Sequence, residues 1–286
     1  MANTAFTTTE ADQFLIDGWA ATVEQTRKRR LIMADVMVDA KLAYSAPVRG
    51  FQNLNITKTG LLNSGAARTK SEGNNNTLTY DTETGTPVTL TVNQWKYQGI
   101  EVEDFAQALT TFDISETYLN EVGEVIARDE DAFLAGFIDN FSNTGGALAV
   151  ENSEDELLAA IQSLNDNDVP DDMRSWVFSE KAYSRLMAQG KIGSMDFSDS
   201  RPVQSGNIPS LYGTPVRHSP NVEGTNAAGH DNGLLRHSAV TRYRVGDFPK
   251  VRPVMSEDNL SEKVSVSNIY GAVEVRDADG YWLKGA

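Results

Sequence analysis

Residues 88–105 read VTLTVNQWKYQGIEVEDF, and the spacing of their apolar side chains limits how this part of the chain can fold. The apolar residues from Val88 to Val92 alternate with polar ones, which is the two-residue period of a half-buried β-strand. Trp95 and Tyr97 then place large apolar groups at positions of the opposite parity. Because a strand that packs on one core keeps one buried face, the change of parity predicts an irregularity here.

The first pattern returns after Gly99, where Ile100 and Val102 are apolar and their neighbours are glutamates. We therefore expect a bend or β-bulge at Gly99, since glycine inside a strand often marks such a feature. A bulge within a single sheet is one interpretation of the stretch. A strand that leaves one core and enters another is the second.

The strongest predicted helix follows at residues 113–141, DISETYLNEVGEVIARDEDAFLAGFIDNF. Its apolar residues recur at helical spacing, and Asp113 with Glu116 resembles a capping box. At 1.5 Å per residue this helix is roughly 40 Å long, far above the average length. Residues 7–46 also have helical spacing and predict a helix before the strands.

A second unit is predicted to begin near residue 147. A helix follows Ser153, residues 174–178 (RSWVF) predict a buried strand, and Ser179 is placed to cap the short helix after it. Residues 190–233 are rich in Gly, Ser, Pro and Asn and are expected to be mainly loops.

Strand patterns return from residue 234 and run to the C-terminus. These closing strands need a partner, and residues 100–103 are the natural one, because both flank the long helix. The sequence therefore predicts the α+β class, with two interleaved bodies.

Composition excludes several classes of protein. The 286-residue chain has a formal net charge of −15 and no cysteine. The acidic excess argues against a protein that coats nucleic acid over most of its surface, and the lack of cysteine excludes disulfides, thiolate metal sites and cysteine nucleophiles. No stretch approaches the ~18 uninterrupted apolar residues of a membrane span, so a membrane is not an expected partner.

Patterns that carry chemistry are sparse. His230 beside Asp231 could form a catalytic pair, but no nucleophile motif accompanies it. Residues 277–280 (DADG) predict a tight turn, since they lack ligand positions of a calcium loop. An acidic loop near Pro170 could collect a cation or simply be solvated; its members are Asp166, Asp168, Asp171 and Asp172. We therefore expect no catalytic residue, no metal and no cofactor.

The basic cluster of the sequence is RKRR, made of Arg27, Lys28, Arg29 and Arg30. It is either a solvated helix face or a contact for a polyanion. Four charges are too few for a domain that reads nucleic-acid sequence, and no aromatic residues interleave with them.

Taken in order, four stretches resemble the major capsid protein family of tailed bacteriophages, which has the Hong Kong 97-like fold. VTLTVNQWKYQGIEVED (88–104) resembles the returning strand of that family's extended loop, and DISETYLNEVGEVIARDEDAFLAGFIDN (113–140) resembles its spine helix. GNIPSLYGTPVRHSPNV (206–222) resembles a segment of its axial domain, and SNIYGAVEVRDADGYWLK (267–284) resembles its final peripheral-domain strands. The resemblance covers nearly the whole chain.

The resemblance implies a Hong Kong 97-like capsid fold with five parts. They are an N-terminal arm (1–49), an extended β-hairpin loop (50–99), a peripheral domain with the spine helix (100–146), an axial domain (147–235) and return strands of the peripheral domain (236–286). It also favours the second interpretation of the opening stretch. Residues 88–93 would then belong to the loop, which lies over a neighbouring subunit, and residues 100–103 to the subunit's own sheet.

The implied function is a non-enzymatic major capsid protein that self-assembles, as pentamers and hexamers, into the icosahedral shell around a phage genome. The implied partners are other copies of the chain, a separate scaffolding protein, a portal and packaged double-stranded DNA held by non-specific contact. The implied location is the virion capsid, after assembly in the host cytoplasm.

Three sets of site residues follow from this resemblance. The basic cluster faces the shell interior. The inter-subunit loop contacts are Leu78, Tyr80, Val88, Leu90 and Val92. The axial-domain contacts are Asp196, Asp199 and Arg201.

Two other functions stay open at this point. One is an encapsulin-type compartment shell, which shares the fold but encloses a protein cargo. The other is a hydrolase or carbohydrate-binding protein whose site the residue pattern does not reveal. Particle size separates the last from the two shells, and the nature of the cargo separates the shells from each other.

Overall fold

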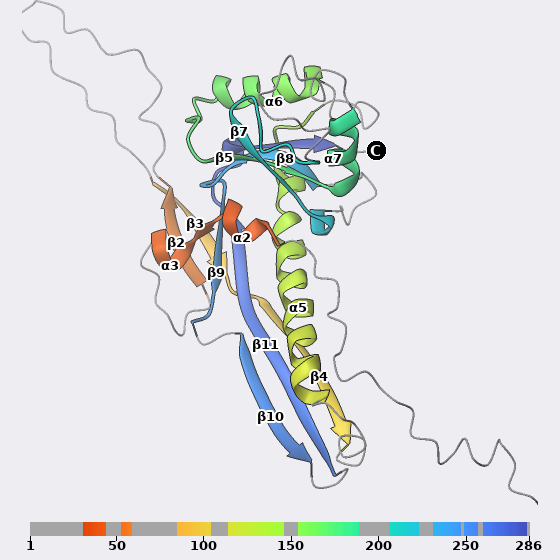
Figure 1. Ribbon diagram of the computed structural model, residues 1–286. Helices are drawn as coiled ribbons and strands as arrows, with labels where there is room; N and C mark the ends of the chain where they lie inside the picture. The colour runs from red at the N-terminus through yellow and green to blue at the C-terminus, as the bar shows by residue number, and fades with distance from the viewer. Residues whose placement is uncertain are drawn as a thin grey trace, which may run out of the picture.

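The computed structural model describes nine stretches of the chain, residues 31–43, 53–58, 85–103, 114–145, 154–188, 206–222, 231–246, 249–256 and 260–284. They form two bodies (Figure 1). The elongated lower body has helix α5 (Ile114–Ala135) lying along a sheet. The upper body has a second sheet with α6 (Glu154–Asp166) and α7 (Glu180–Ala188).

The sheet of the lower body is built on one long strand, β11 (Ser261–Glu274). Its 14 residues span about 46 Å. Four strands complete the sheet, β1 (Val38–Asp39), β9 (Val240–Arg244), β10 (Lys250–Ser256) and β4 (Gln94–Glu103). β4 pairs antiparallel with β11 from Gln94 opposite Tyr270 to Glu103 opposite Ser261, so the expected partner of the closing strands is confirmed.

β4 has no bulge at Gly99. Each of its residues opposes one residue of β11 in an unbroken register, so the irregularity expected at Gly99 is wrong. The interruption lies earlier, between β3 (Thr86–Thr91) and the start of β4. The physical reason for the odd parity is exposure: Trp95 and Tyr97 are 70% and 78% exposed, while Ile100 packs toward α5.

The hairpin stem consists of β3 and β2 (Asn53–Lys58), which pair antiparallel. Its inner face is buried on the lower body, where Ile56 and Leu90 pack with Tyr243 of β9. The stretch thus serves two clusters, since Ile100 belongs to a separate one with Val122, Ile126 and Val266. Residues 59–84, which follow β2 in the sequence and precede β3, lie outside the described residues.

The sheet of the upper body has five strands, in the order β12 (Gly280–Lys284), β8 (Asp231–Arg236), β5 (Arg174–Phe178), β7 (Thr214–His218) and β6 (Ser210–Leu211). The predicted strand at 174–178 is confirmed. So is the cap at Ser179, whose Oγ accepts a hydrogen bond from the backbone N–H of Ala182 at 3.2 Å. The predicted turn at 277–280 is confirmed as the 3₁₀ turn Asp277–Asp279.

The 3₁₀ turn Asp277–Asp279 changes the predicted division of the chain into domains. It directs β12 onto β8, with Trp282 opposite Gly233. The last strand therefore completes the sheet of the upper body, whereas the sequence-based division placed all of 236–286 in the other one. Residues 236–286 thus contribute strands to both bodies.

The long helix is confirmed, although it ends at Ala135, before the predicted residue 141. A short 3₁₀ turn, Ile138–Asn140, follows it. The continuous helix predicted for 7–46 is wrong over residues 31–43. There α2 (Met33–Val36) and α3 (Ala40–Ala43) are separated by Met37, which is extended, and by β1, which pairs parallel with β9.

One hydrophobic cluster joins the two bodies. It combines residues at the end of α5, such as Leu134, with Met33 of α2 and Val177 of β5. Val222 and Trp282 complete it from the upper body. The bodies therefore share a core rather than meet through a linker.

Gly271 of β11 lies where the hairpin crosses the sheet. An added Cβ would overlap the carbonyl oxygen of Thr91 and lie 2.9 Å from the Cα of Val92. We expect Gly271→Ala to lower the free energy of unfolding by about 1–3 kcal/mol, because backbone must shift to make room. Gly123→Ala on α5 is the control, since nothing lies within 4 Å of its added Cβ.

Alanine favours a helix over glycine by about 0.5–1 kcal/mol, so the Gly123 control is expected to be neutral or stabilising. Denaturant titration followed by circular dichroism measures both variants. A Gly271→Ala chain as stable as the wild type would show that the hairpin does not pack closely on β11.

Candidate assembly interface

Two adjacent buried carboxylates on α5, Glu130 and Asp131, are 5% and 3% exposed. Glu130 binds the sheet below the helix. Its Oε2 accepts hydrogen bonds from Arg244 Nη2 at 2.6 Å and from Asn268 Nδ2 at 2.7 Å. Arg242 Nη1 lies 3.8 Å from the other carboxylate oxygen. Glu130 thus joins α5 to β9 and β11 at once.

Asp131 binds two different segments. Its Oδ1 accepts hydrogen bonds from the backbone N–H groups of Ile32 (3.1 Å) and Met33 (2.8 Å), and its Oδ2 accepts one from Asn221 Nδ2 (2.9 Å). Burial raises the pKa of Asp131 above its ordinary value, although these hydrogen bonds act in the opposite direction. One side chain therefore holds the start of α2, the helix α5 and the 3₁₀ turn Pro220–Val222 together.

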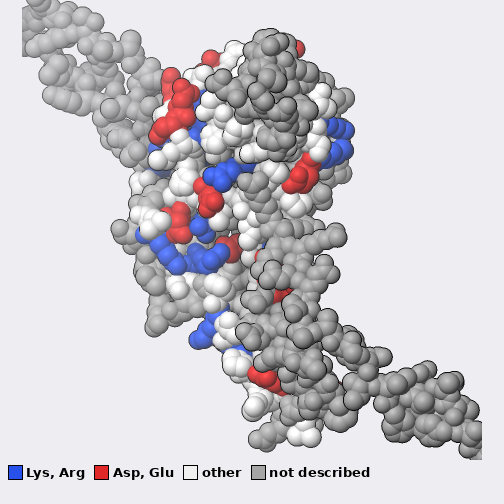
Figure 2. All heavy atoms as spheres, in the orientation of Figure 1, with Lys and Arg blue, Asp and Glu red and all other residues white. Residues whose placement is uncertain are grey.

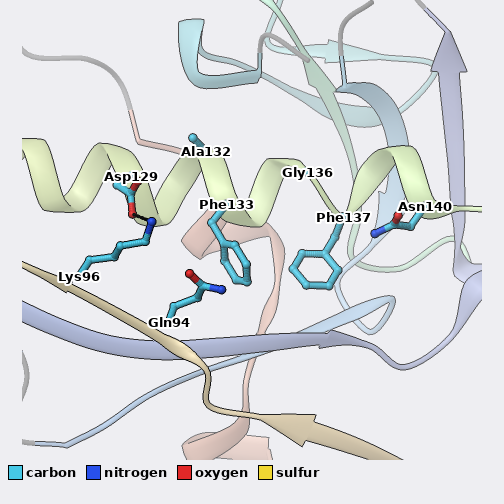
Figure 3. Close-up of a pocket in the computed structure, with 8 residues that line it drawn as sticks. All are labelled: Gln94, Lys96, Asp129, Ala132, Phe133, Gly136, Phe137 and Asn140. Carbon is cyan, nitrogen blue, oxygen red and sulfur yellow. Dashed lines mark ion pairs between the residues drawn. The ribbon is translucent and has the colours of Figure 1, made fainter. Parts of the chain in front are cut away.

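A cavity of about 430 Å³ lies between α5 and the start of β4 (Figure 3). Figure 3 shows the rings of Phe133 and Phe137 pointing from α5 toward Gln94, and the two ring centroids are 5.4 Å apart, edge to face. At the rim, Lys96 Nζ lies 3.6 Å from an oxygen of Asp129. The complete lining is Gln94, Lys96, Asp129, Ala132, Phe133, Gly136, Phe137 and Asn140. Aromatic rings and side-chain amides suit contact with another protein segment.

The face of the lower sheet that points away from α5 carries two exposed aromatic side chains. Trp95 lies opposite Ile269, and Tyr97 lies opposite Ser267. Ser267 in turn lies opposite the exposed Lys250 of β10. We call Trp95, Tyr97, Ile269, Lys250 and Arg252 the aromatic sheet face. Large exposed aromatic groups with cations at the rim are typical of protein interfaces.

The predicted loop contacts divide between the subunit's own core and its surface. Leu90 is fully buried in the subunit's own core, so the structure gives it a role different from the neighbour contact expected of it. Val92 packs partly against the same cluster, and Val88 is half-buried opposite Ile56. The alternation of apolar and polar residues is the same for a strand that packs on its own subunit and for one that packs on a neighbouring subunit, so it could not distinguish the two. Leu78 and Tyr80 lie outside the described residues.

The other predicted site residues lie mostly outside the described residues. This applies to the basic cluster 27–30, to the axial contacts Asp196, Asp199 and Arg201, and to His230. The acidic loop near Pro170 is described and is tied by ion pairs: Asp171 to Arg174 at 2.9 Å and Asp172 to Arg236 at 3.1 Å. Among the described residues, no group of three or more His, Cys, Asp or Glu side chains could hold a metal ion.

A second pair of carboxyl groups consists of Glu274, at the end of β11, and Asp277, three positions later at the start of the 3₁₀ turn. Their spacing alone did not predict that the two side chains interact. Burial raises the pKa of Glu274 to about 7. The charge of Asp277 acts in the same direction, as does the hydrogen bond that the protonated Glu274 donates to it. Lys58, at the end of the hairpin stem, opposes the shift. The pair therefore lies where the end of the hairpin stem meets the end of β11.

No helix within the described ranges is long and apolar enough to cross a membrane. No protein-family model matches this sequence, and no curated protein matches it.

Solved structures do match in fold. A structure from Mycobacterium phage Che8 aligns with a TM-score of 0.77 at 18% identity, covering 96% of this chain and 98% of its own. The capsid structure of cyanophage P-SCSP1u gives 0.75 at 16% identity, covering 100% and 97%. The capsid of a native GTA particle gives 0.67 at 13% identity, covering 100% of both chains. The chain therefore has the mixed helix-and-sheet fold of phage capsid structures, as the sequence resemblance predicted.

Asp131→Ala should destabilise the chain by at least about 3 kcal/mol, because it leaves three buried N–H donors without their acceptor. Asp35→Ala is the matched control on the neighbouring α2. Its side chain is 69% exposed and lies 3.8 Å from Arg217, so its loss should cost less than about 1 kcal/mol. Chemical denaturation measures both, and equal effects would contradict the role given to Asp131.

Glu274 predicts how stability depends on pH. Its pKa is raised from 4.5 to about 7 in the folded chain, so the folded state binds the proton more tightly than the unfolded state. The stabilisation that protonated Glu274 gives the folded chain is complete below the pKa of Glu274 in the unfolded chain. It is lost as pH rises through the pKa of Glu274 in the folded chain. Between about pH 5 and pH 8, the Tm of the wild type should fall relative to that of Glu274→Gln. Parallel Tm curves for the two proteins would contradict this.

Proposed function

We propose that this chain is a major capsid protein, which self-assembles into the closed shell of a tailed phage. The observation that carries the proposal is the agreement in fold with phage capsid structures over nearly the full length of both chains. In this proposal the lower body is the peripheral domain and the upper body is the axial domain. Pentamers and hexamers of the chain make the shell, and the chain performs no catalysis.

The proposed contact between subunits involves both ends of the stretch 88–105. The stem of the hairpin packs on its own subunit through Ile56 and Leu90, so residues 59–84 are the part of the loop that we propose for the contact. Those residues reach a neighbour and rest on its aromatic sheet face. This assignment gives Trp95 and Tyr97 a partner, whereas two aromatic side chains left 70% and 78% exposed would favour non-specific association.

The remaining partners are proposed on charge and on the resemblance. Packaged double-stranded DNA and a separate scaffolding protein would meet the basic cluster 27–30 from inside the shell, and a portal would replace one five-fold capsomer. Asp196, Asp199 and Arg201 would lie near the capsomer centres. The shell would assemble in the host cytoplasm and become the virion capsid.

Electron microscopy of the purified full chain tests the proposal. Closed particles of uniform diameter are expected, and nuclease-protected DNA inside particles from infected cells identifies a phage shell. Particles that hold one protein cargo and no DNA would favour the encapsulin-type alternative. A chain that forms no particles, either when purified alone or in infected cells that supply its partners, contradicts both.

Trp95→Ser combined with Tyr97→Ser should leave the isolated subunit folded, because both side chains are already exposed. Fully burying one aromatic side chain contributes about 1.5–3 kcal/mol, so particle yield should fall at least tenfold. Sedimentation measures the yield, and thermal unfolding measures the subunit. Leu158→Ser, which removes an exposed apolar group from α6, is the control and should change neither. Normal particles from the double variant would exclude the aromatic sheet face as a contact.

A further inference from the structure

The two lateral margins of the upper body carry opposite charges. Strand β5 separates them: the loop at 167–173 precedes it, and α7 follows it directly. Five residues of strand span about 17 Å, so the two margins lie at opposite ends of the sheet. In Figure 2, red spheres gather at the left margin of the upper body, and blue spheres lie at its right margin with a red patch beside them. An acidic residue of that margin is Glu180 at the start of α7, which pairs with His218 at 2.9 Å.

The acidic margin is a rigid surface. Arg174, which is buried, pairs with Asp171 at 2.9 Å, and both carboxylate oxygens of Asp172 accept hydrogen bonds from Arg236 Nη2, at 3.1 and 3.2 Å. Two further aspartates, Asp166 and Asp168, are exposed at the end of α6. Ion pairs therefore fix the backbone of the loop, and the outer aspartates give the margin its negative charge.

An apolar side chain lies in the middle of this margin. Met173 is 70% exposed, and its φ of 57° is in the left-handed region, which an unbranched residue adopts only at some cost. Its carbonyl oxygen accepts a hydrogen bond from the backbone N–H of His237 at 3.0 Å, which holds the residue in this conformation. A fixed, exposed methionine among aspartates is a feature of a surface that binds protein, since methionine fills irregular recesses.

The basic margin has the complementary composition. Lys181, Ser184, Arg185 and Ala188 are the exposed residues of α7, and their spacing places them on one helix face. The opposite face is buried through Ala182, Tyr183 and Leu186. The exposed face therefore presents two cations beside two small residues, and the small residues leave room for a partner's side chain.

We propose that the acidic margin of one copy docks on the α7 face of the next copy, head to tail around the capsomer. Met173 then lies against Ser184 and Ala188, while Asp166 and Asp168 meet the cations. Because the two patches differ, the contact is heterologous, and such a contact forms a ring when the rotation from one copy to the next closes. A two-fold contact through either margin alone would oppose like charges. This inference rests on the proposed function and assigns its contact around the ring to named residues.

Three variants of the full chain test the contact. The first, Asp166→Lys with Asp168→Asn, removes the negative charge of one margin; asparagine is chosen because Asp168 has a φ of 55°, which asparagine tolerates. The second, Lys181→Glu with Arg185→Glu, reverses the other margin. The third carries all four substitutions, so opposite charges face each other again with their positions exchanged.

We expect each single-margin variant to form particles at least about tenfold less well than the wild type, and the four-substitution variant to recover most of that loss. Folding defects would add up in the third variant, so recovery cannot come from them. The subunit melting curve, measured on each variant, checks the fold directly. Assembly of both single-margin variants at the wild-type level, or a four-substitution variant no better than they are, overturns the inference.

Mixing the two single-margin variants gives a sharper result. Both margins of the first are neutral to basic and both margins of the second are acidic, so the two can alternate around a ring. Alternation closes in a ring of six, but a ring of five leaves one pair of like margins in contact. We therefore expect the mixture to form six-membered rings and extended arrays of them without closed shells, as seen by native mass spectrometry and electron microscopy.

Closed shells from the mixture, at wild-type yield, would also overturn the inference. Failure of the proposed contact can be distinguished from failure of the proposed function. A wild-type chain that forms no particles contradicts the function itself. A wild-type chain that forms shells, with variants and mixture that do the same, contradicts only the contact between the margins.

Discussion

The buried carboxylates of Glu130 and Asp131 hold the molecule together at its centre. Neighbouring positions on a helix point in different directions, so Glu130 reaches β9 and β11 while Asp131 reaches α2 and the turn at Pro220–Val222. Each carboxylate is compensated by hydrogen bonds, as a buried charge must be. Removing either would leave buried donors unpaired, and this makes the junction stiff as well as stable.

This junction explains why a chain with two bodies can serve as one building block. The cluster around Leu134 contains residues of both bodies, and β11 and β12 carry the chain from one to the other. Surfaces that are far apart, the aromatic sheet face and the two margins of the upper body, thereby keep a fixed relation. The proposed shell would need such a relation, because every copy must present the same contact surfaces to its neighbours in each ring.

Local patterns predicted the parts of the fold that depend on local forces. Helical spacing predicted α5, and the capping position of Ser179 predicted the start of α7. Both features depend on interactions between residues that are close in the sequence. Pairing across long separations was harder. The stretch does serve two hydrophobic clusters, as predicted, but the parity of Trp95 and Tyr97 results from their exposure. The strand β12 was assigned to the wrong sheet. Leu90 repeats the pattern of Val88, and only the fold shows that it faces Tyr243.

The carboxylate junction should hold the two bodies as one rigid unit in the proposed shell. Electron cryomicroscopy of the shell tests this directly, since an icosahedral particle holds copies in five-fold and six-fold surroundings. We expect α5, β9, residues 31–36 and residues 220–222 to superpose as one unit in every independent copy, with differences confined to parts farther from the junction. Copies related by a rotation of the upper body about residues 136–145 would contradict it.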